Sequence, residues 1–251
     1  DLFMNRAVDI SVGSLSPTIN WGTLKHQEFL IPPKQKQSQL AELLLSKDEV
    51  IQKGVELDQK LTLVRQSFMT EIYRKVPKNL KENNLIEIGD ILKLSSGKTR
   101  PKNLLEISND EYKYPVYGGN GIIGFSKEYL IDYPTIILGR VGEYCGVVHE
   151  SASESWVSDN ALYVKEFLSD LDKMYISRFL EFIDLNKQQN RSSHPLISQS
   201  KVNMNKIAIL DEGFISKSME KLTQIETILN DVKNTYLLSK NLYKKLINQV
   251  F

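Results

Sequence analysis

The sequence has one cysteine, Cys145, among 251 residues, and only three histidines. A single thiol excludes an internal disulfide and a cysteine-rich metal site, and it is typical of proteins from a reducing compartment. His26, His149 and His194 are far apart, and none has another ligating residue at a spacing typical of metal sites. We therefore expect no metal site and an intracellular, cytoplasmic protein.

Long apolar runs and a strong net charge are also missing. No run approaches the roughly eighteen uncharged residues that are needed to span a bilayer, and the segment from Asp1 to Arg6 lacks the order of a signal peptide. The formal net charge is +1, so no global field favours a membrane or a nucleic acid. We expect no membrane association, and a chain that begins with a helical pattern at Asp1 is expected to be part of a longer protein.

The sequence also lacks a recognisable catalytic constellation. Cys145 stands between Tyr144 and Gly146 in a strand-like run, which is typical of a small buried hydrophobic residue. No serine lies in the Gly-rich turn of a nucleophile elbow. We therefore expect a non-catalytic chain.

The last segment, residues 216–251, carries a narrow apolar seam. From Leu222 onward, apolar or small residues alternate at steps of three and four, and no proline or glycine interrupts them. This is the heptad pattern of a coiled coil, whose seam must be buried against a partner helix. The seam residues are Leu222, Ile225, Leu229, Val232, Tyr236, Ser239, Tyr243, Leu246 and Val250.

Residues 38–73 supply a candidate partner with similar steps. Gly54 falls on this seam, where it is either a flaw that costs about 1 kcal/mol relative to alanine or a site of close helix approach. Both interpretations stay open, but the pattern predicts two long helices that pack together. The expected seam is Leu40, Leu44, Val50 or Ile51, Leu57, Leu61, Val64, Phe68 and Ile72.

Between the two predicted helices the pattern changes to short apolar runs separated by Gly, Pro and Asn turn signals. These runs predict strands near residues 115–117, 122–125, 135–138, 146–148, 161–164 and 207–210, with a helix near 168–189. Residues 18–31 are expected to form a turn and one or two strands. The predicted fold class is therefore α+β, with a β-rich domain, a helix packed on it and two long helices.

The chain contains a direct repeat with an offset of 178 residues. Ser16-Pro17-Thr18-Ile19 then aligns with His194-Pro195-Leu196-Ile197, and the apolar positions of the two long helices coincide. The sequence thus predicts the end of one unit, its helix, and a complete second unit with its own helix.

Two glycine-containing segments resemble nucleotide-binding motifs. Residues 119–124 match the dinucleotide pattern, but that motif needs a helix that begins inside it, whereas β-branched residues follow here. Gly97-Lys98-Thr99 resembles the end of a phosphate-binding loop, yet Leu92 occupies the position of the opening glycine. A glycine-rich hairpin is favoured, and an enzyme that binds a nucleotide at Gly118–Gly124 remains the alternative.

Two stretches are basic although the whole chain is not. Residues 93–105 and 186–210 contain lysine and arginine without any acid, and the second also holds several Asn and Gln side chains. Cations contact phosphates, and amide or guanidinium groups read base edges. The two stretches could equally be ordinary solvated loops. Their cations are Lys93, Lys98, Arg100 and Lys102, and Lys187, Arg191, Lys201 and Lys206.

The order of β-rich domain, long helix, β-rich domain and long helix resembles the specificity subunit of type I restriction–modification systems. The resemblance covers essentially the whole chain, although residues 209–212 lack the proline pair of residues 32–33. The segments that carry it are Ser96–Pro101, Tyr114–Gly124, Ile137–Gly142 with Gly146, Trp156–Ala161 and Phe29–Gln37.

This resemblance implies a non-catalytic DNA reader. In such subunits each target recognition domain reads one half of a bipartite site, and the two long helices pack antiparallel as a spacer. The helices also dock the methylation subunits, which carry S-adenosylmethionine, and the ATP- and Mg-dependent restriction subunits join that complex. No cofactor is expected in this chain, and a coiled-coil interaction module without a DNA role is a further alternative.

The resemblance also implies a division of the chain and a set of contacts. Residues 1–32 are expected to be the remnant of a first target recognition domain, 33–76 the central helix, 77–84 a linker, 85–210 the second recognition domain and 211–251 the last helix. The expected contacts with double-stranded DNA are Lys98, Thr99, Arg100, Lys102, Asn120, Arg140, Lys187, Arg191 and Lys201, with Asn120 and Arg140 as candidates for base edges.

Overall fold

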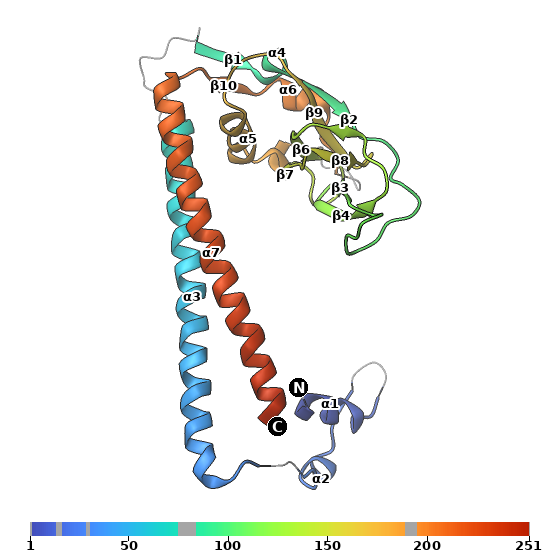
Figure 1. Cartoon of the computed structure of the whole chain (residues 1–251), viewed down its shortest axis with the longest axis vertical. Helices are drawn as coiled ribbons and strands as arrows, with labels where there is room; N and C mark the ends of the chain where they lie inside the picture. The colour runs from blue at the N-terminus through green and yellow to red at the C-terminus, as the bar shows by residue number, and fades with distance from the viewer. Residues whose placement is uncertain (1, 14–16, 29–30, 75–83, 189–194, 251) are drawn as a thin grey trace. The chain divides into compact units, whose positions relative to one another are not determined.

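A computed structural model of the chain describes residues 2–13, 17–28, 31–74, 84–188 and 195–250 (Figure 1). Helices and sheets are both present, which confirms the predicted α+β class. The chain divides into a helical unit, Asp1–Gln66 with Thr223–Phe251, and a sheet unit, Ser67–Leu222. These divisions fall inside the two long helices, so each helix contributes residues to both units.

The two long helices are α3 (Lys34–Arg74) and α7 (Glu212–Val250). Their first residues are separated by the 178 positions of the sequence repeat. Within the helical unit they lie side by side (Figure 1), with Arg65 paired to Glu226 at 2.7 Å and Gly54 against Tyr236. Moving forward along α3 from 54 to 65 corresponds to moving back along α7 from 236 to 226, so the pair is antiparallel.

The expected seam of α7 coincides with the buried side of that helix. Leu222 is buried, and the seam residues from Ile225 to Leu246 are half-buried, whereas most of their neighbours are exposed. The side chain of Val250 lies outside the described part of the chain. On α3, the half-buried apolar seam residues are Leu40, Leu44, Ile51, Leu61 and Phe68, and Ile72 is buried.

Two expected seam residues of α3 require correction. Leu57 and Val64 are 45% and 50% exposed, and the half-buried positions are the next ones, Asp58 and Arg65. The side chains of Arg65 and Glu226 are each only 18% exposed. An apolar pattern in one helix cannot locate such a position, because the ion-pair partner that makes arginine acceptable there lies on the other helix.

Gly54 marks a close approach of the two helices. A Cβ atom built on Gly54 would lie 2.5 Å from the Cβ of Tyr236, which is far inside van der Waals contact. Of the two interpretations of this glycine, the structure therefore supports close helix approach.

The 178-residue repeat also appears at short helices. In the helical unit, α1 (Leu2–Asp9) is followed by α2 (Trp21–Leu24), where the Asn20 side chain accepts a hydrogen bond from Gly22 N at 2.7 Å. In the sheet unit, Ser198 caps α6 (Gln199–Asn203) at the equivalent position. The strands expected within 18–31 are therefore replaced, in the described residues, by a capped helical turn.

The described residues of the sheet unit form three small sheets. One is antiparallel and has the order β2-β9-β6-β7; a second has the order β4-β3-β8-β5 with β3 and β8 parallel; β1 pairs with β10. The strands are β1 (Leu85–Glu87), β2 (Leu92–Ser96), β3 (Tyr114–Gly118), β4 (Gly121–Ser126), β5 (Ile131–Asp132), β6 (Ile136–Gly139), β7 (Val148–Glu150), β8 (Glu154–Val157), β9 (Ala161–Phe167) and β10 (Lys206–Ala208). The remaining helices are α4 (Ile88–Ile91), α5 (Lys173–Phe182) and the 3₁₀ helix η2 (Leu185–Gln188).

The core of the sheet unit joins α5 to the sheets and to the adjoining ends of α3 and α7. At its centre the Tyr73 hydroxyl donates to the Tyr175 carbonyl at 2.9 Å, and the Tyr175 hydroxyl donates to the Ala208 carbonyl at 3.0 Å. Tyr73 also packs against Phe179, with ring centres 5.7 Å apart. Burial raises the pKa of both phenols well above the ordinary value.

Within the described segments, every helix is too short or too polar to be a membrane span. Cys145 is fully buried, as expected of a small hydrophobic residue, and its thiol donates to the Arg140 carbonyl at 3.2 Å. Burial raises the pKa of this thiol.

The close approach at Gly54 generates a stability prediction. Gly54→Ala should lower the free energy of unfolding by about 1–3 kcal/mol, because overpacking at Tyr236 outweighs the roughly 1 kcal/mol that alanine contributes in a helix. Chemical denaturation followed by circular dichroism measures the change. Gln59→Ala, at an exposed position of α3, is the matched control and should be neutral or slightly stabilising. Equal effects of the two variants would contradict the close approach.

The buried tyrosines generate a pH prediction. Below about pH 10 the phenols are neutral in both states, and their contribution to stability is complete. Above it, the unfolded chain loses protons that folded Tyr73 and Tyr175 retain, so stability falls by up to about 1.4 kcal/mol per pH unit for each. Urea unfolding between about pH 8 and 11.5 should show a shallower decline for Tyr73→Phe than for the wild type. Tyr129→Phe, at an exposed ring, should leave the slope unchanged.

Candidate nucleic-acid interface

Four described loops of the sheet unit meet at one set of strand ends: the loops after β2 and β6, the turn between β8 and β9, and the turn between β3 and β4. After β2, Gly97 N donates to the Ala161 carbonyl at 3.1 Å and Lys98 N donates to the Val157 carbonyl at 2.9 Å. After β6, Arg140 N donates to the Asn160 carbonyl at 2.9 Å. Backbone hydrogen bonds thus hold the turn between β8 and β9 together with the loops that follow β2 and β6.

Glycines permit this close packing. A Cβ on Gly97 would lie 2.0 Å from the Ser158 carbonyl oxygen, and one on Gly139 would lie 2.4 Å from that of Gly119. No side chain fits at either position without moving the backbone. Gly97, in one of the two segments that resemble nucleotide-binding motifs, and Gly139 therefore allow separate loops to touch, which is a packing role.

The glycine-rich segment 118–124 forms a hairpin. Strands β3 and β4 are antiparallel, Gly119 and Asn120 form the turn, and Gly121 follows with a positive φ of 90°. The ring of His149 lies beneath Gly121, and burial lowers the pKa of this histidine. A strand stands where a dinucleotide motif requires a helix N-terminus, so the physical basis for a pyrophosphate cradle is missing.

Five of the expected contacts lie on these converging loops. Asn120 is exposed at the tip, and the backbone beside it touches the Gly139 segment that leads to Arg140. The half-buried Arg140 donates to the Ser96 hydroxyl at 3.4 Å, directly before the loop that carries Lys98. Lys98, Thr99 and Arg100 are all exposed.

The second basic stretch adjoins the same loops. Leu196 pairs with Val141 as an isolated bridge, and Gln199 reaches the Ser96 hydroxyl at 3.5 Å. Lys201 donates to the Gln188 carbonyl at 2.8 Å, and Lys187 forms an exposed ion pair with Asp184 at 2.7 Å. Arg191 lies outside the described residues.

Lys102 lies elsewhere, in a hollow at the opposite end of the hairpin. It shares this hollow with Tyr112 and Lys127, which the sequence interpretation did not select. Glu111 precedes Tyr112 and Glu128 follows Lys127 in the sequence, so neither residue lies in an acid-free basic stretch. The available signal was the interleaving of lysines with the tyrosines at 112, 114 and 129.

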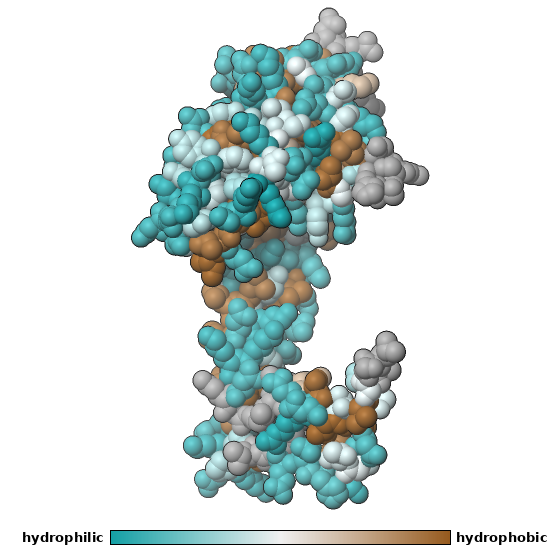
Figure 2. All heavy atoms as spheres, turned by 90° about the vertical axis from the view of Figure 1, so that its right-hand side faces the viewer, coloured by the Kyte–Doolittle hydropathy of each residue, from teal (hydrophilic) through white to brown (hydrophobic). Residues whose placement is uncertain are grey.

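The helical unit exposes an apolar surface of its own. Leu43, Val50, Leu57 and Val64 recur every seven residues on α3, and each directly precedes a seam position. On α7, Ile228, Leu238 and Leu242 also directly precede seam residues. Positions that precede the seam lie on the same side of an antiparallel pair. We call these seven residues, each between 41% and 63% exposed, the apolar flank. Figure 2, coloured by hydropathy, shows that apolar side chains occur among polar ones on the surface of the protein.

No metal site emerges from the described residues, among which no group of three or more His, Cys, Asp or Glu side chains could hold an ion. The arrangement described above is that of a binding surface, with donors presented from loops on a close-packed scaffold.

Comparisons with known proteins agree with this geometry. A curated relative is the EcoprrI type I restriction enzyme specificity subunit of Escherichia coli, which is 25% identical over 149 residues, or 58% of this chain. The match spans only 37% of that relative.

Solved structures share the fold. The S subunit of the type I restriction–modification system from M. genitalium has a TM-score of 0.73 at 16% identity, covering 98% of this chain and 69% of that one. The HsdS subunit from Thermoanaerobacter tengcongensis has a TM-score of 0.56 at 12% identity, covering 99% and 67%. A type I R-M system structure described by its complex assembly and conformational transition gives 0.61 at 12% identity, with the same coverage.

The family model for the type I restriction modification DNA specificity domain matches residues 81–209, just over half of the chain. These residues contain all four converging loops, the turn of the β3–β4 hairpin among them. The chain therefore belongs to the family of type I restriction–modification DNA specificity domains.

Proposed function

We propose that this chain is the sequence-reading subunit of a type I restriction–modification complex and that its sheet unit contacts one half of a bipartite DNA site. The observation that carries the proposal is the meeting of four loops around Asn120 and Arg140 within the segment that matches the family. Exposed amide and cationic groups on a fixed loop scaffold suit a duplex surface.

Two classes of contact follow from side-chain chemistry. The Asn120 amide can form paired hydrogen bonds with adenine, and the Arg140 guanidinium can do so with guanine. Lys98, Arg100, Lys102, Lys187, Arg191 and Lys201 are proposed to contact phosphates, with the Thr99 hydroxyl beside them.

The long helices are proposed to set the spacing of the two half-sites. Helices of 41 and 39 residues measure about 60 Å at 1.5 Å per residue, which is more than one turn of duplex DNA at about 34–36 Å. The apolar flank supplies a docking surface for the methylation subunits, since an exposed apolar side of a helix pair favours partner helices.

The reaction chemistry belongs to the partners in this proposal. Methylation subunits bind S-adenosylmethionine, restriction subunits use ATP and Mg²⁺, and this chain is non-catalytic. The two rival functions have less support: the hairpin removes the nucleotide cradle, and a coiled-coil module without a DNA role leaves the family match of the sheet unit unexplained.

The interface generates a specificity prediction. Asn120→Ala should relax or change the methylated sequence at one base position, at a cost of about 1–3 kcal/mol in discrimination. Lys98→Ala and Arg191→Ala should weaken binding equally on all sequences and reduce the salt slope by about one unit each. Sequencing of methylated sites in cells, together with DNA-binding titrations, distinguishes the two effects. Lys240→Ala, at an exposed position of α7, is the control. The proposed face would be refuted if Asn120→Ala, Lys98→Ala and Arg191→Ala all bound DNA like the wild type.

The apolar flank generates a docking prediction. Leu57→Glu with Val64→Glu should abolish co-purification with the methylation subunit, because docking would bury two charges. Leu63→Glu is the matched control, since Leu63 is 62% exposed and lies on another side of α3. Circular dichroism checks that both proteins keep their helices. If the double variant still co-purifies at the wild-type level, the apolar flank is not the docking surface.

A further inference from the structure

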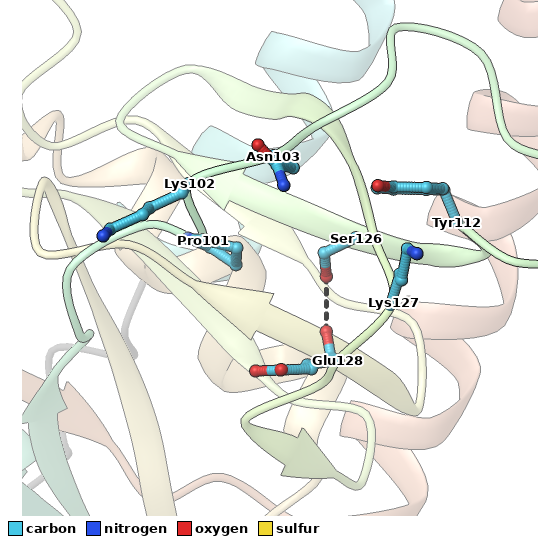
Figure 3. Close-up of a pocket in the computed structure, with 7 residues that line it drawn as sticks. All are labelled: Pro101, Lys102, Asn103, Tyr112, Ser126, Lys127 and Glu128. Carbon is cyan, nitrogen blue, oxygen red and sulfur yellow. Dashed lines mark hydrogen bonds between the residues drawn. The ribbon is translucent and has the colours of Figure 1, made fainter.

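The open end of the β3–β4 hairpin contains a hollow of about 310 Å³ (Figure 3). Its walls come from two separate parts of the chain, the loop before β3 and the residues at the end of β4. In Figure 3 the Tyr112 hydroxyl points toward Asn103, and Lys127 lies beneath them. The lining residues are Pro101, Lys102, Asn103, Tyr112, Ser126, Lys127 and Glu128.

The hollow is held in place by hydrogen bonds. Leu105 and Phe125 exchange backbone hydrogen bonds of 3.1 and 2.8 Å, which attach the loop to β4. The Asn109 side chain accepts hydrogen bonds from Glu111 N at 3.0 Å and Tyr112 N at 2.7 Å. These contacts order the loop, so its polar groups are positioned before any ligand arrives.

Cations and aromatic rings alternate around this hollow. The Lys127 ammonium lies 4.8 Å from the centre of the Tyr112 ring and also pairs with Glu111. The Lys113 ammonium lies 4.9 Å from the centre of the Tyr114 ring. Lys113 directly precedes β3 and Lys127 directly follows β4, so both lie at the open end of the hairpin.

Two cations, Lys102 and Lys127, and one acid, Glu128, line the hollow, and Glu111 is already paired with Lys127. An anion in the hollow can accept hydrogen bonds from the two ammonium groups, the Tyr112 hydroxyl and the Asn103 amide. A phosphodiester is an anion that such donors recognise.

We propose that this hollow binds a backbone phosphate of the duplex, with Lys127, Lys102 and Tyr112 as its donors. The inference rests on the proposed DNA-reading function and adds an anchoring contact to it. Lys127 lies seven positions after Asn120, which is about 23 Å along the strand and about seven base pairs along the duplex. The anchor fixes the register in which Asn120 meets its base.

The test uses the full-length protein with the subunits that accompany it. The probe is a fluorescein-labelled duplex of about 30 mixed-sequence base pairs, followed by anisotropy from about 50 to 200 mM salt. Lys127→Gln should reduce the salt slope by about 0.9, so its loss of affinity relative to wild type should be about 3.5-fold larger at 50 mM than at 200 mM salt. Lys102→Gln should act in the same direction, and the methylated sequence should stay unchanged.

Glu111→Gln separates ligand binding from loop support. This variant breaks the ion pair but leaves the Lys127 cation, so it should bind the duplex as tightly as wild type or more tightly. A merely structural lysine predicts the opposite, that Glu111→Gln loses as much affinity as Lys127→Gln. Lys127→Arg should retain most of the binding, and thermal unfolding verifies that each variant is folded.

The outcomes separate this inference from the function on which it rests. Wild-type binding that depends on Lys98 but is unaffected by Lys127→Gln and Lys102→Gln overturns the phosphate hollow alone. A wild-type protein that shows no salt-dependent duplex binding overturns the DNA-reading function and the hollow together.

Discussion

The antiparallel register of α3 and α7 underlies the helical unit, and two contacts specify it. Gly54 admits the Tyr236 side chain at a distance that no other residue allows, and Arg65 meets Glu226 where both side chains are largely shielded from water. An apolar seam alone tolerates shifts along its length, because one leucine resembles the next. A glycine notch and a shielded ion pair do not tolerate them, since a shift leaves a clash and an unpaired charge.

Glycine has a second role in the sheet unit, where it lets loops meet. Gly97 and Gly139 bring carbonyl oxygens of neighbouring loops within distances that a side chain would block. The result is a rigid base from which Asn120, Arg140 and the exposed residues after Ser96 project. Such a base suits recognition, because donors that are positioned before binding lose less conformational entropy on contact with a duplex.

The near-neutral net charge is compatible with a DNA-binding surface because the positive charge is local. Acid-free stretches lie beside the converging loops, and a further group of lysines surrounds the hollow at the far end of the hairpin. The acids of the sheet unit lie outside these acid-free stretches. Distribution, more than the total, decides where a phosphate backbone can approach.

The sequence by itself determined the α+β class, the α7 seam, the hairpin at 118–124 and the 178-residue repeat, which recurs in helix starts and in the caps Asn20 and Ser198. These features depend on local periodicity and turn chemistry, which a short window of residues contains. Only the tertiary structure decided that Arg65 replaces Val64 in the seam, that Gly54 is a notch, and that Tyr112 and Lys127 share a hollow with Lys102. Each of these depends on a partner distant in the chain, and the energy of such a contact cannot be derived from the residue pattern of either segment alone.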